Sequence, residues 1–213
     1  MSRTSAAVSR SNDPAATRQD ILDVAIREFA KKGLAGARID EIAAQTATSK
    51  RMIYYYFQSK QGLYLAALEE SYRGIRQIEG TLHLEDLPPV EAMRTLVGFT
   101  FDYESRNQDF VRLVMNENMH YGHYLEQSDT INDVNWPVIN SIRDIYARGC
   151  KENMFRTGLD PVDIHASISA LCFYNVSNQY TFSLIFRRDI MSPGAFAKRR
   201  SSVIDMILRY MQV

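Results

Sequence analysis

The sequence has few cysteines and no long apolar segment. Its two cysteines, Cys150 and Cys172, form no C-x-x-C motif. A disulfide framework or a zinc site is therefore unexpected, and a reducing cytoplasm is the expected compartment. No stretch approaches the roughly 20 apolar residues that span a bilayer. The N-terminus also lacks the apolar segment of a signal peptide. We expect a cytoplasmic protein with no membrane partner.

The sequence also lacks the common motifs of catalysis. It has no G-x-S-x-G, no H-E-x-x-H and no glycine-rich phosphate loop, and no nucleophile stands in a recognisable pairing with a base. We therefore expect no catalytic residues, no cofactor and no enzymatic activity. A small helical enzyme remains as a remote alternative.

Excess charge is absent from the chain as a whole, but the charge is unevenly distributed. The formal net charge is zero. Residues 1–60 contain ten Lys and Arg against six Asp and Glu, and the other residues carry the compensating acidic excess. A basic front and an acidic rear fit a two-part molecule in which only the front faces phosphate groups.

Alternating apolar and polar residues, the pattern of strands, are absent, whereas apolar residues recur every three or four positions. This spacing is typical of amphipathic helices. Capping residues, glycines and prolines place the helix ends. The expected fold is all-α with about nine helices, at residues 17–32, 39–45, 49–57, 59–77, 90–105, 108–120, 134–150, 161–186 and 193–211.

The expected domain organisation follows from these helices. Residues 1–16 are rich in Ser, Ala and Arg and predict a disordered basic arm. Residues 17–60 form a three-helix domain, and residues 61–79 form a connecting helix. Two prolines mark a linker within residues 80–89. Residues 80–213 then form a second, larger helical domain.

The stretch from 38 to 60 predicts a helix-turn-helix. Two short helices flank the turn at 46–48, where Ala47 stands near its centre. The second helix is short enough to enter the major groove, which is about 12 Å wide. Successive helical residues point about 100° apart, so at least one of three consecutive tyrosines must face outward. The predicted buried positions are Ile39, Ile42, Ala43, Ile53 and Phe57.

This stretch resembles the tetracycline-repressor (TetR) family of transcriptional regulators over about residues 17–72. The turn usually has glycine where this chain has Ala47, which predicts a slightly different turn. The resemblance rests on residues in the family's order and spacing, namely Ala25, Phe29, Gly33, Ile42, Ala43, Ser49, Ile53, Tyr54, Tyr56, Phe57, Ser59, Lys60 and Leu63.

The resemblance implies a DNA-binding surface made largely by the second helix of the motif. Cations at its start would reach phosphates or guanine edges, and tyrosine hydroxyls would donate to phosphate. Two alternatives stay open: Tyr54 and Tyr56 as core residues, and Lys50 and Arg51 as an ordinary solvated face. The implied contacts are Arg38, Ser49, Lys50, Arg51, Met52, Tyr54, Tyr55, Tyr56 and Lys60.

Polar side chains in the later helices are candidates for binding a ligand, because buried amides need hydrogen-bonding partners. The alternative is that these groups face a dimer partner or water. His120 and His123 lie three residues apart, but no convincing third ligand accompanies them, so we expect no metal site. The ligand candidates are Met115, Asn118, His120, Tyr124, Tyr174, Asn175 and Asn178.

The resulting hypothesis is a sequence-specific regulator, most simply a repressor that a small-molecule effector releases from DNA. The resemblance implies that residues 17–60 are a DNA-binding domain and residues 80–213 an effector-binding and dimerisation domain. It also implies a homodimer formed through the last two long helices. Two heads would then engage a palindromic operator in double-stranded DNA. A constitutive DNA-binding regulator without an effector is the alternative.

Overall fold

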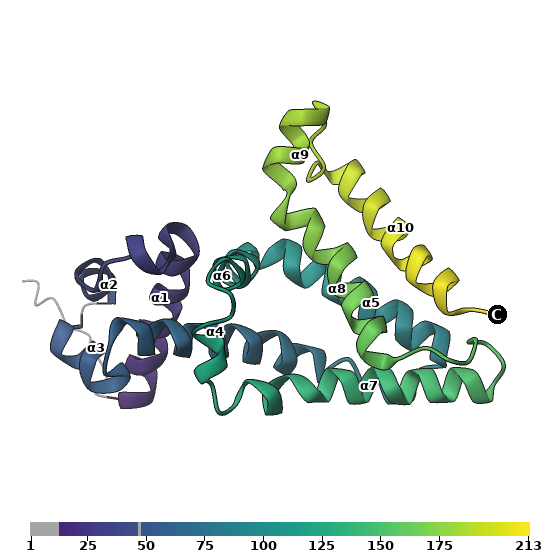
Figure 1. Ribbon diagram of the computed structural model, residues 1–213, viewed down its shortest axis with the longest axis horizontal. Coiled ribbons are helices and arrows are strands. Elements are labelled where there is room, and N and C mark those ends of the chain that lie inside the picture. Colours follow the sequence, from purple (N-terminus) through teal and green to yellow (C-terminus); the bar gives the residue numbers. More distant parts are fainter. Residues whose placement is uncertain (1–12, 47) are drawn as a thin grey trace, which may run out of the picture.

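The N-terminal helices form a small head at one end of the molecule (Figure 1). The computed structural model describes residues 13–46 and 48–213, so most of the predicted basic arm, and Ala47 in the turn, lie outside the described residues. The head contains α1 (Pro14–Gly36), α2 (Ile39–Thr46) and α3 (Lys50–Phe57). These helices confirm the predicted helix-turn-helix.

Helix α1 begins before the predicted position. Asp13 caps it by accepting a hydrogen bond from the Ala15 N–H at 2.9 Å, and Pro14 occupies the first turn. The prediction that this helix starts at residue 17 was therefore wrong, because the Asp-Pro pair gives a stronger start signal. The predicted break at Gly33 is present, since its φ of 67° and ψ of 172° interrupt the helix. This backbone conformation is one that glycine adopts almost exclusively.

Helix α4 (Lys60–Glu79) connects the head to a larger body. Ser59 caps it through the Gly62 N–H at 2.9 Å, as predicted. The first half of α4 completes the core of the head with Leu63, Tyr64 and Leu68. The second half lies in the body. One continuous helix therefore belongs to both parts.

The body consists of six further helices and two short 3-10 turns. In Figure 1, α4 and α7 run along one edge, whereas α8 and α10 rise to the protruding helix α9. The remaining elements are η1 (Leu84–Asp86), α5 (Pro89–Arg106), α6 (Gln108–Met119), η2 (Leu125–Gln127), α7 (Ile131–Lys151), α8 (Pro161–Ser177), α9 (Gln179–Phe186) and α10 (Pro193–Met211).

Two predicted helices in the body differ from the observed ones. Helix α7 starts at Ile131 because the Ser128 hydroxyl accepts from the Ile131 N–H at 3.1 Å, so Pro137 lies inside the helix. The single helix predicted at 161–186 is divided into α8 and α9 at Asn178. The described residues therefore contain ten α-helices, close to the nine expected, and the all-α class is confirmed.

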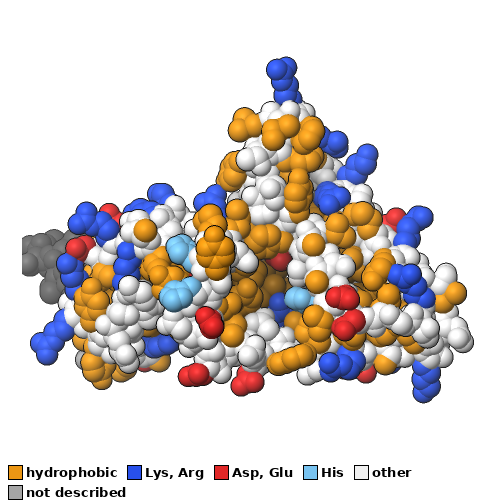
Figure 2. Space-filling model, viewed as in Figure 1, with side chains coloured by type: hydrophobic (Ala, Val, Ile, Leu, Met, Phe, Trp, Pro, Cys, Tyr) orange, Lys and Arg blue, Asp and Glu red, His pale blue; other side chains and the backbone are white. Residues whose placement is uncertain are grey.

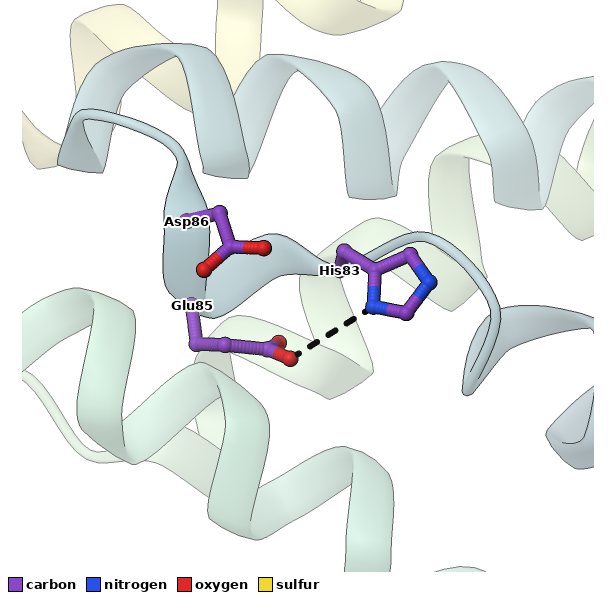
Figure 3. Close-up of side chains that lie close together, drawn as sticks. All are labelled: His83, Glu85 and Asp86. Atoms are coloured by element: carbon purple, nitrogen blue, oxygen red, sulfur yellow. Dashed lines mark ion pairs between the residues drawn. The ribbon is translucent and has the colours of Figure 1, made fainter.

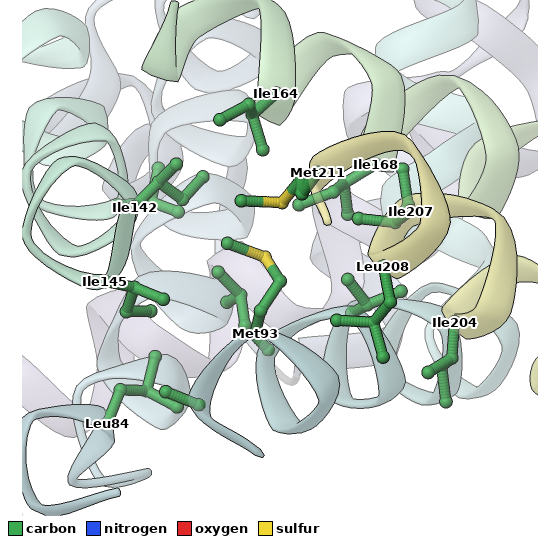
Figure 4. Close-up of a cluster of buried hydrophobic side chains, with 14 of the residues drawn as sticks. Leu84, Met93, Ile142, Ile145, Ile164, Ile168, Ile204, Ile207, Leu208 and Met211 are labelled. Atoms are coloured by element: carbon green, nitrogen blue, oxygen red, sulfur yellow. The ribbon is translucent and has the colours of Figure 1, made fainter. Parts of the chain in front are cut away.

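The largest apolar cluster holds α5, α7, α8 and α10 together (Figure 4). Met93, Ile142, Ile164 and Met211 are among its fully buried side chains. Burying apolar area stabilises a fold by roughly 25 cal/mol per Å², so this cluster fixes the body as one unit. No helix of the described part is both long and apolar enough to cross a membrane.

Candidate DNA-binding surface and ligand cavity

Helix α3 is anchored by two side chains and presents the rest of its surface to solvent. Ile53 and Phe57 are buried in the core of the head. The sequence-predicted residues Lys50, Arg51 and Met52 are exposed on the same helix. This arrangement leaves the outer face of α3 available to a groove.

The three tyrosines differ in exposure. Tyr55 is 74% exposed and Tyr54 is 46% exposed. Tyr56 is half-buried, packs against the core of the head and meets the Tyr55 ring edge to face at 5.3 Å. Tyr55 therefore points outward, and Tyr54 is not a core residue. Tyr56 lies at the border of the core.

Ser49 and Lys50 already have partners in the free protein. The Ser49 hydroxyl caps α3 by accepting from the Met52 N–H at 3.3 Å. Lys50 forms an ion pair with Asp40 in the first turn of α2, and both side chains are exposed. An exposed pair of this kind contributes at most about 1 kcal/mol, so a phosphate group can compete for the lysine.

Arg38 and Lys60 flank the motif and differ in their surroundings. Arg38 is exposed directly before α2. Lys60 is half-buried, and its Nζ donates to the Ala35 carbonyl at 3.3 Å. Lys60 thus ties the start of α4 to the end of α1. Arg38 and Arg51 form no ion pair with any residue that the structure describes.

The body contains an inner cavity of about 150 Å³ between α4, α5, α6, α7 and α8. Figure 2 shows a hollow on this face of the molecule, with acidic, basic and histidine side chains at its walls. The wall is mostly apolar, with four titratable groups among its lining residues. These residues are Tyr72, Ile75, Arg76, Leu96, Thr100, Glu104, Phe110, Val114, Asn135, Val138, Ile142, His165, Ile168, Ser169 and Phe173.

Arg76 brings a permanent positive charge to this cavity. One guanidinium nitrogen pairs with Glu79, which is 7% exposed. The Nε atom is buried and has no hydrogen-bond partner among the described residues. Burial lowers the pKa of Arg76, but an arginine stays protonated in proteins. A buried N–H without a partner costs free energy that a ligand can recover.

Glu104 lies in the same wall and is 4% exposed. Burial raises the pKa of Glu104 to about 8, although the charge of Arg76 acts in the opposite direction. Its Oε2 atom has no hydrogen-bond partner among the described residues. At neutral pH, Glu104 is therefore mostly a neutral carboxylic acid that can donate a hydrogen bond.

His165 completes the set of titratable groups on the cavity wall. Burial lowers the pKa of His165 to about 4, and the nearby Arg76 acts in the same direction. The imidazole is therefore neutral at physiological pH. The cavity wall thus combines the Arg76 guanidinium, which is paired with Glu79, with neutral polar groups.

An outer groove of about 350 Å³ continues from the inner cavity towards solvent. The two share Tyr72, Asn135, Val138 and His165 in their walls. The outer groove reaches Trp136, which is 51% exposed on α7. Apolar side chains dominate its lining, so the groove suits the apolar part of a ligand.

None of the seven ligand candidates from the sequence lines the inner cavity. Tyr174 and Asn175 instead line a second cavity of about 300 Å³ between α8, α9 and α10. Asn178 lies at the end of α8 and donates to Ser177 at 2.8 Å. These three residues therefore sit near the protruding end of the body rather than at its centre.

The other four candidates lie on or after α6. Met115 packs beside an apolar cluster, and the Asn118 side chain donates to the Val114 carbonyl at 2.8 Å. His120 ends α6, with its Nδ1 at 2.7 Å from the Asn116 carbonyl. Tyr124 packs against the core of the head and meets the Tyr64 ring edge to face at 5.3 Å. Packing on this side of α6 therefore directs the stretch after it to the head instead of the inner cavity.

Sequence reasoning missed Arg76, Glu104 and His165. The available signal was a charged or polar residue inside an apolar helical face. Glu104 follows Leu96 and Thr100 at intervals of four on α5, and Arg76 follows Tyr72 in the same way. Residues on the apolar face of a helix are buried in a helical bundle. A charged side chain at a buried position is uncommon and is often functional.

A candidate metal-binding cluster lies elsewhere, at the turn before α5 (Figure 3). His83, Glu85 and Asp86 offer ligand atoms within 4.8 Å of one another, and His83 Nδ1 is 3.7 Å from Glu85. All three side chains are exposed. Exposed acidic groups commonly gather in this way without an ion, so the cluster remains a surface feature.

Helix α6 joins the cavity to the head. Phe110 and Val114 on this helix line the inner cavity. One turn further on, Glu117 is buried and accepts from the Tyr124 and Leu125 N–H groups, both at 2.8 Å. Burial and the negative charge of Glu117 raise the pKa of Tyr64 in the head.

Comparison with known proteins gives matches along most of the chain. The model for bacterial regulatory proteins of the tetR family matches residues 21–67. The model for the tetracyclin repressor-like C-terminal domain matches residues 89–207. The HTH-type transcriptional repressor NicS of Pseudomonas putida is 33% identical over 193 residues, which cover 91% of each chain.

Solved structures agree with these matches. A transcriptional regulator, SCO4942 of Streptomyces coelicolor, is 26% identical with a TM-score of 0.69, covering 92% of this chain and 98% of that one. The regulator FadR of Bacillus subtilis, solved in complex with stearoyl-CoA, has a TM-score of 0.66 at 16% identity, covering 89% and 97%. The second likeness concerns the fold alone.

Proposed function

Since the chain belongs to the TetR family of bacterial transcriptional regulators, we propose that it acts as a homodimeric repressor released from a palindromic operator by a small-molecule ligand. The family membership makes it a DNA-binding transcriptional regulator. The proposal adds the contact residues, the dimer interface and the position of the ligand.

The outward face of α3 is the observation that carries the DNA-binding part. Arg51 and Tyr55 are exposed on an eight-residue helix whose opposite side is fixed by Ile53 and Phe57. We assign base contacts to Arg51, Met52, Tyr54 and Tyr55. Phosphate contacts are assigned to Arg38, Ser49, Lys50, Tyr56 and Lys60, because phosphate contacts fix the register of a protein on DNA.

The dimer interface is proposed on α8 and α10. Val162, Ala166, Ala170 and Tyr174 are exposed at intervals of four along one face of α8. Small residues allow a second helix to approach closely. On α10, Met206 and Tyr210 are exposed, whereas Val203 and Ile207 are already buried within the monomer. A helix from a second copy would cover these exposed apolar positions.

Helix α9 supports the same interface. Leu184, Ile185 and Phe186 are 79%, 70% and 62% exposed on this protruding helix. Large apolar side chains gathered on one element are a common mark of a protein interface. Because α9 directly continues from α8, a partner on α8 also reaches these side chains. Light scattering should give twice the monomer mass, and Ala170→Glu should reduce it.

The ligand is proposed to bind in the inner cavity. The cavity wall contains buried polar atoms without hydrogen-bond partners, and burying such atoms costs free energy. A bound effector would supply the missing partners, so the cavity favours an effector-controlled regulator over a constitutive one. The proposed domains are those expected from the sequence, namely a DNA-binding domain at 17–60, a connecting helix at 61–79 and an effector domain at 80–213, except that α1 extends the first domain back to Pro14.

Selection of bound duplexes from a random DNA pool tests the function. The expected result is an inverted repeat whose half-sites lie about one helical turn, or 34 Å, apart or at a multiple of it. Arg51→Ala should weaken binding to the selected duplex. Arg143→Ala, on an exposed position of α7, is the matched control and should not. Failure to enrich any repeated half-site would contradict the proposal.

A further inference from the structure

We infer that the effector is a small organic acid, held as its carboxylate by the unpaired Nε side of Arg76 beside Glu104, with its apolar body directed towards Trp136. This inference rests on the proposed function, because it identifies the chemistry of the ligand in the inner cavity. Arg76 and Glu104 lie on different helices, α4 and α5, and line the same cavity.

The unpaired atoms define what the ligand must offer. The Nε atom of Arg76 is a donor without an acceptor among the described residues, and it is fully buried. Glu104 is protonated at neutral pH because burial raises its pKa to about 8, so it adds a second donor. Tyr72 contributes a phenol to the same wall. A group that accepts at two oxygens, such as a carboxylate, satisfies these donors together.

Glu79 already balances the charge of Arg76, so the preference for an anion over a cation comes from the donors that face the cavity. Arg76 keeps its charge at all physiological pH values, whereas Glu104 gives up its charge when buried. His165 is neutral in the same wall, since burial lowers its pKa to about 4. An amine ligand would have to remove the proton of Glu104 and lie beside a permanent cation. A carboxylate binds without any change in the protonation of Glu104 or His165.

The volume limits the size of the acid. A cavity of about 150 Å³ in a protein interior is sufficient to bind benzene, and the inner cavity has this volume. The outer groove, with Ile131 and Trp136 in its lining, offers space for additional apolar atoms. An acyl-coenzyme A is far larger than the inner cavity. The ligand therefore resembles a single ring or a short chain carrying one acid group.

Three sets of probes test this chemistry by isothermal titration of the full-length protein. The acids are benzoate, cyclohexanecarboxylate and hexanoate. The neutral counterparts are benzamide, cyclohexanecarboxamide and hexanamide, and the cation is benzylamine. We expect at least one acid to bind at least about tenfold more tightly than its amide, because a charge-assisted hydrogen bond is about twice as strong as a neutral one. Benzylamine should not bind.

Two variants identify the groups that hold the acid. Arg76→Gln combined with Glu79→Gln removes a buried ion pair without leaving either charge unpaired, and should weaken binding of the acid about 10- to 100-fold. Glu104→Gln keeps a neutral donor in place and should preserve binding within a few-fold. Asn178→Leu is the control variant. Asn178 lies outside the inner cavity, so this variant should bind the acid like the wild type.

The outcomes separate the inference from the proposed function. Binding of none of the acids, equal binding of an acid and its amide, or binding of benzylamine that Glu104→Gln abolishes would each overturn the inference. In all three cases, selection of an inverted repeat from the DNA pool would still support the proposed function. Circular dichroism of the variants distinguishes loss of the binding group from loss of the fold.

Discussion

Tyr72 of α4 and Phe110 of α6 meet edge to face in the wall of the inner cavity, with ring centroids 5.3 Å apart and planes at 90°. Helix α4 runs from this contact into the core of the head. Helix α6 reaches the head separately, where the Asn116 side chain donates to the Phe29 carbonyl at 3.4 Å. The pair therefore connects the cavity to both supports of the DNA-binding head.

The first prediction concerns this connection. Phe110→Leu should reduce the effect of ligand on operator affinity, because the shorter side chain no longer holds α4 and α6 at a fixed spacing. An effector usually changes affinity at the second site by about 5- to 150-fold. We expect the variant to lose most of this change in operator affinity. Operator titrations with and without a saturating acid measure the change.

The control for the coupling prediction is Phe99→Leu. Phe99 lies on α5 in an open surface groove and does not line the inner cavity. Because linkage is reciprocal, operator DNA must weaken ligand binding by the same factor as ligand weakens operator binding. A ligand that binds with equal affinity to free and operator-bound protein would rule out this allosteric scheme.

The second prediction concerns base recognition by α3. Arg51→Ala or Tyr55→Ala should weaken binding to the operator by about 1–3 kcal/mol, the usual value of a specific interaction between a side chain and a base. Both side chains are exposed, so the thermal stability of the free protein should change little. Competition experiments at fixed salt against operator variants give the affinities. If both variants bind like the wild type, α3 does not read the sequence through these residues.

The third prediction separates two cations that flank the helix-turn-helix. Arg38→Ala and Lys60→Ala should each weaken specific and non-specific DNA binding alike. Each should also reduce the slope of log affinity against log salt concentration by about one unit. Only Lys60→Ala should also lower the free energy of unfolding, by about 0.5–1.5 kcal/mol, because Lys60 donates to the Ala35 carbonyl.

Salt titrations with operator and with random duplex DNA measure the first effect, and urea unfolding measures the second. Relaxed sequence preference in either variant would show that the residue reads bases. An unchanged free energy of unfolding in Lys60→Ala would mean that the hydrogen bond to Ala35 contributes nothing to stability.

The fourth prediction is a pH dependence of stability that arises from Glu104. Burial raises the pKa of Glu104 from its ordinary value of 4.5 to about 8, so the unfolded chain loses this proton at a lower pH than the folded chain does. The contribution of Glu104 to the free energy of unfolding is therefore fully present below pH 4.5 and is lost as the pH rises towards 8.

His165 acts in the opposite direction over part of this range. Burial lowers the pKa of His165 from 6.5 to about 4, so its contribution is fully present above pH 6.5 and is lost as the pH falls towards 4. The two slopes oppose each other between pH 4.5 and 6.5. A pH profile of the wild-type protein therefore conceals both effects over that interval.

Comparison of Glu104→Gln with the wild type isolates the carboxyl group. The difference in the free energy of unfolding should grow in favour of the variant by about 1.4 kcal/mol per pH unit between pH 4.5 and 8. Urea unfolding at several pH values measures it, and Glu126→Gln, at an exposed position, controls for loss of a carboxylate. A difference independent of pH would show that Glu104 is ionised in the folded protein.

The sequence alone determined the helical class, the helix-turn-helix and most helix ends, because these depend on short-range signals. Ser49 and Ser59 cap their helices as predicted. Ile53 and Phe57 are buried at the predicted spacing, which in turn determines that Tyr55 points outward. The starts of α1 and α7 were predicted too late, because the Asp13 carboxylate and the Ser128 hydroxyl accept hydrogen bonds from N–H groups nearer the N-terminus.

Only the tertiary structure decided which polar groups share a cavity. Arg76, Glu104 and His165 come from three helices that are distant in the sequence, and periodicity within one helix cannot place them together. Tyr174 and His120 belong to conspicuous polar stretches, yet packing directs them to the protruding end and to the head. A ligand site requires side chains from several helices to converge, and the crossing of those helices is set by how their apolar faces pack.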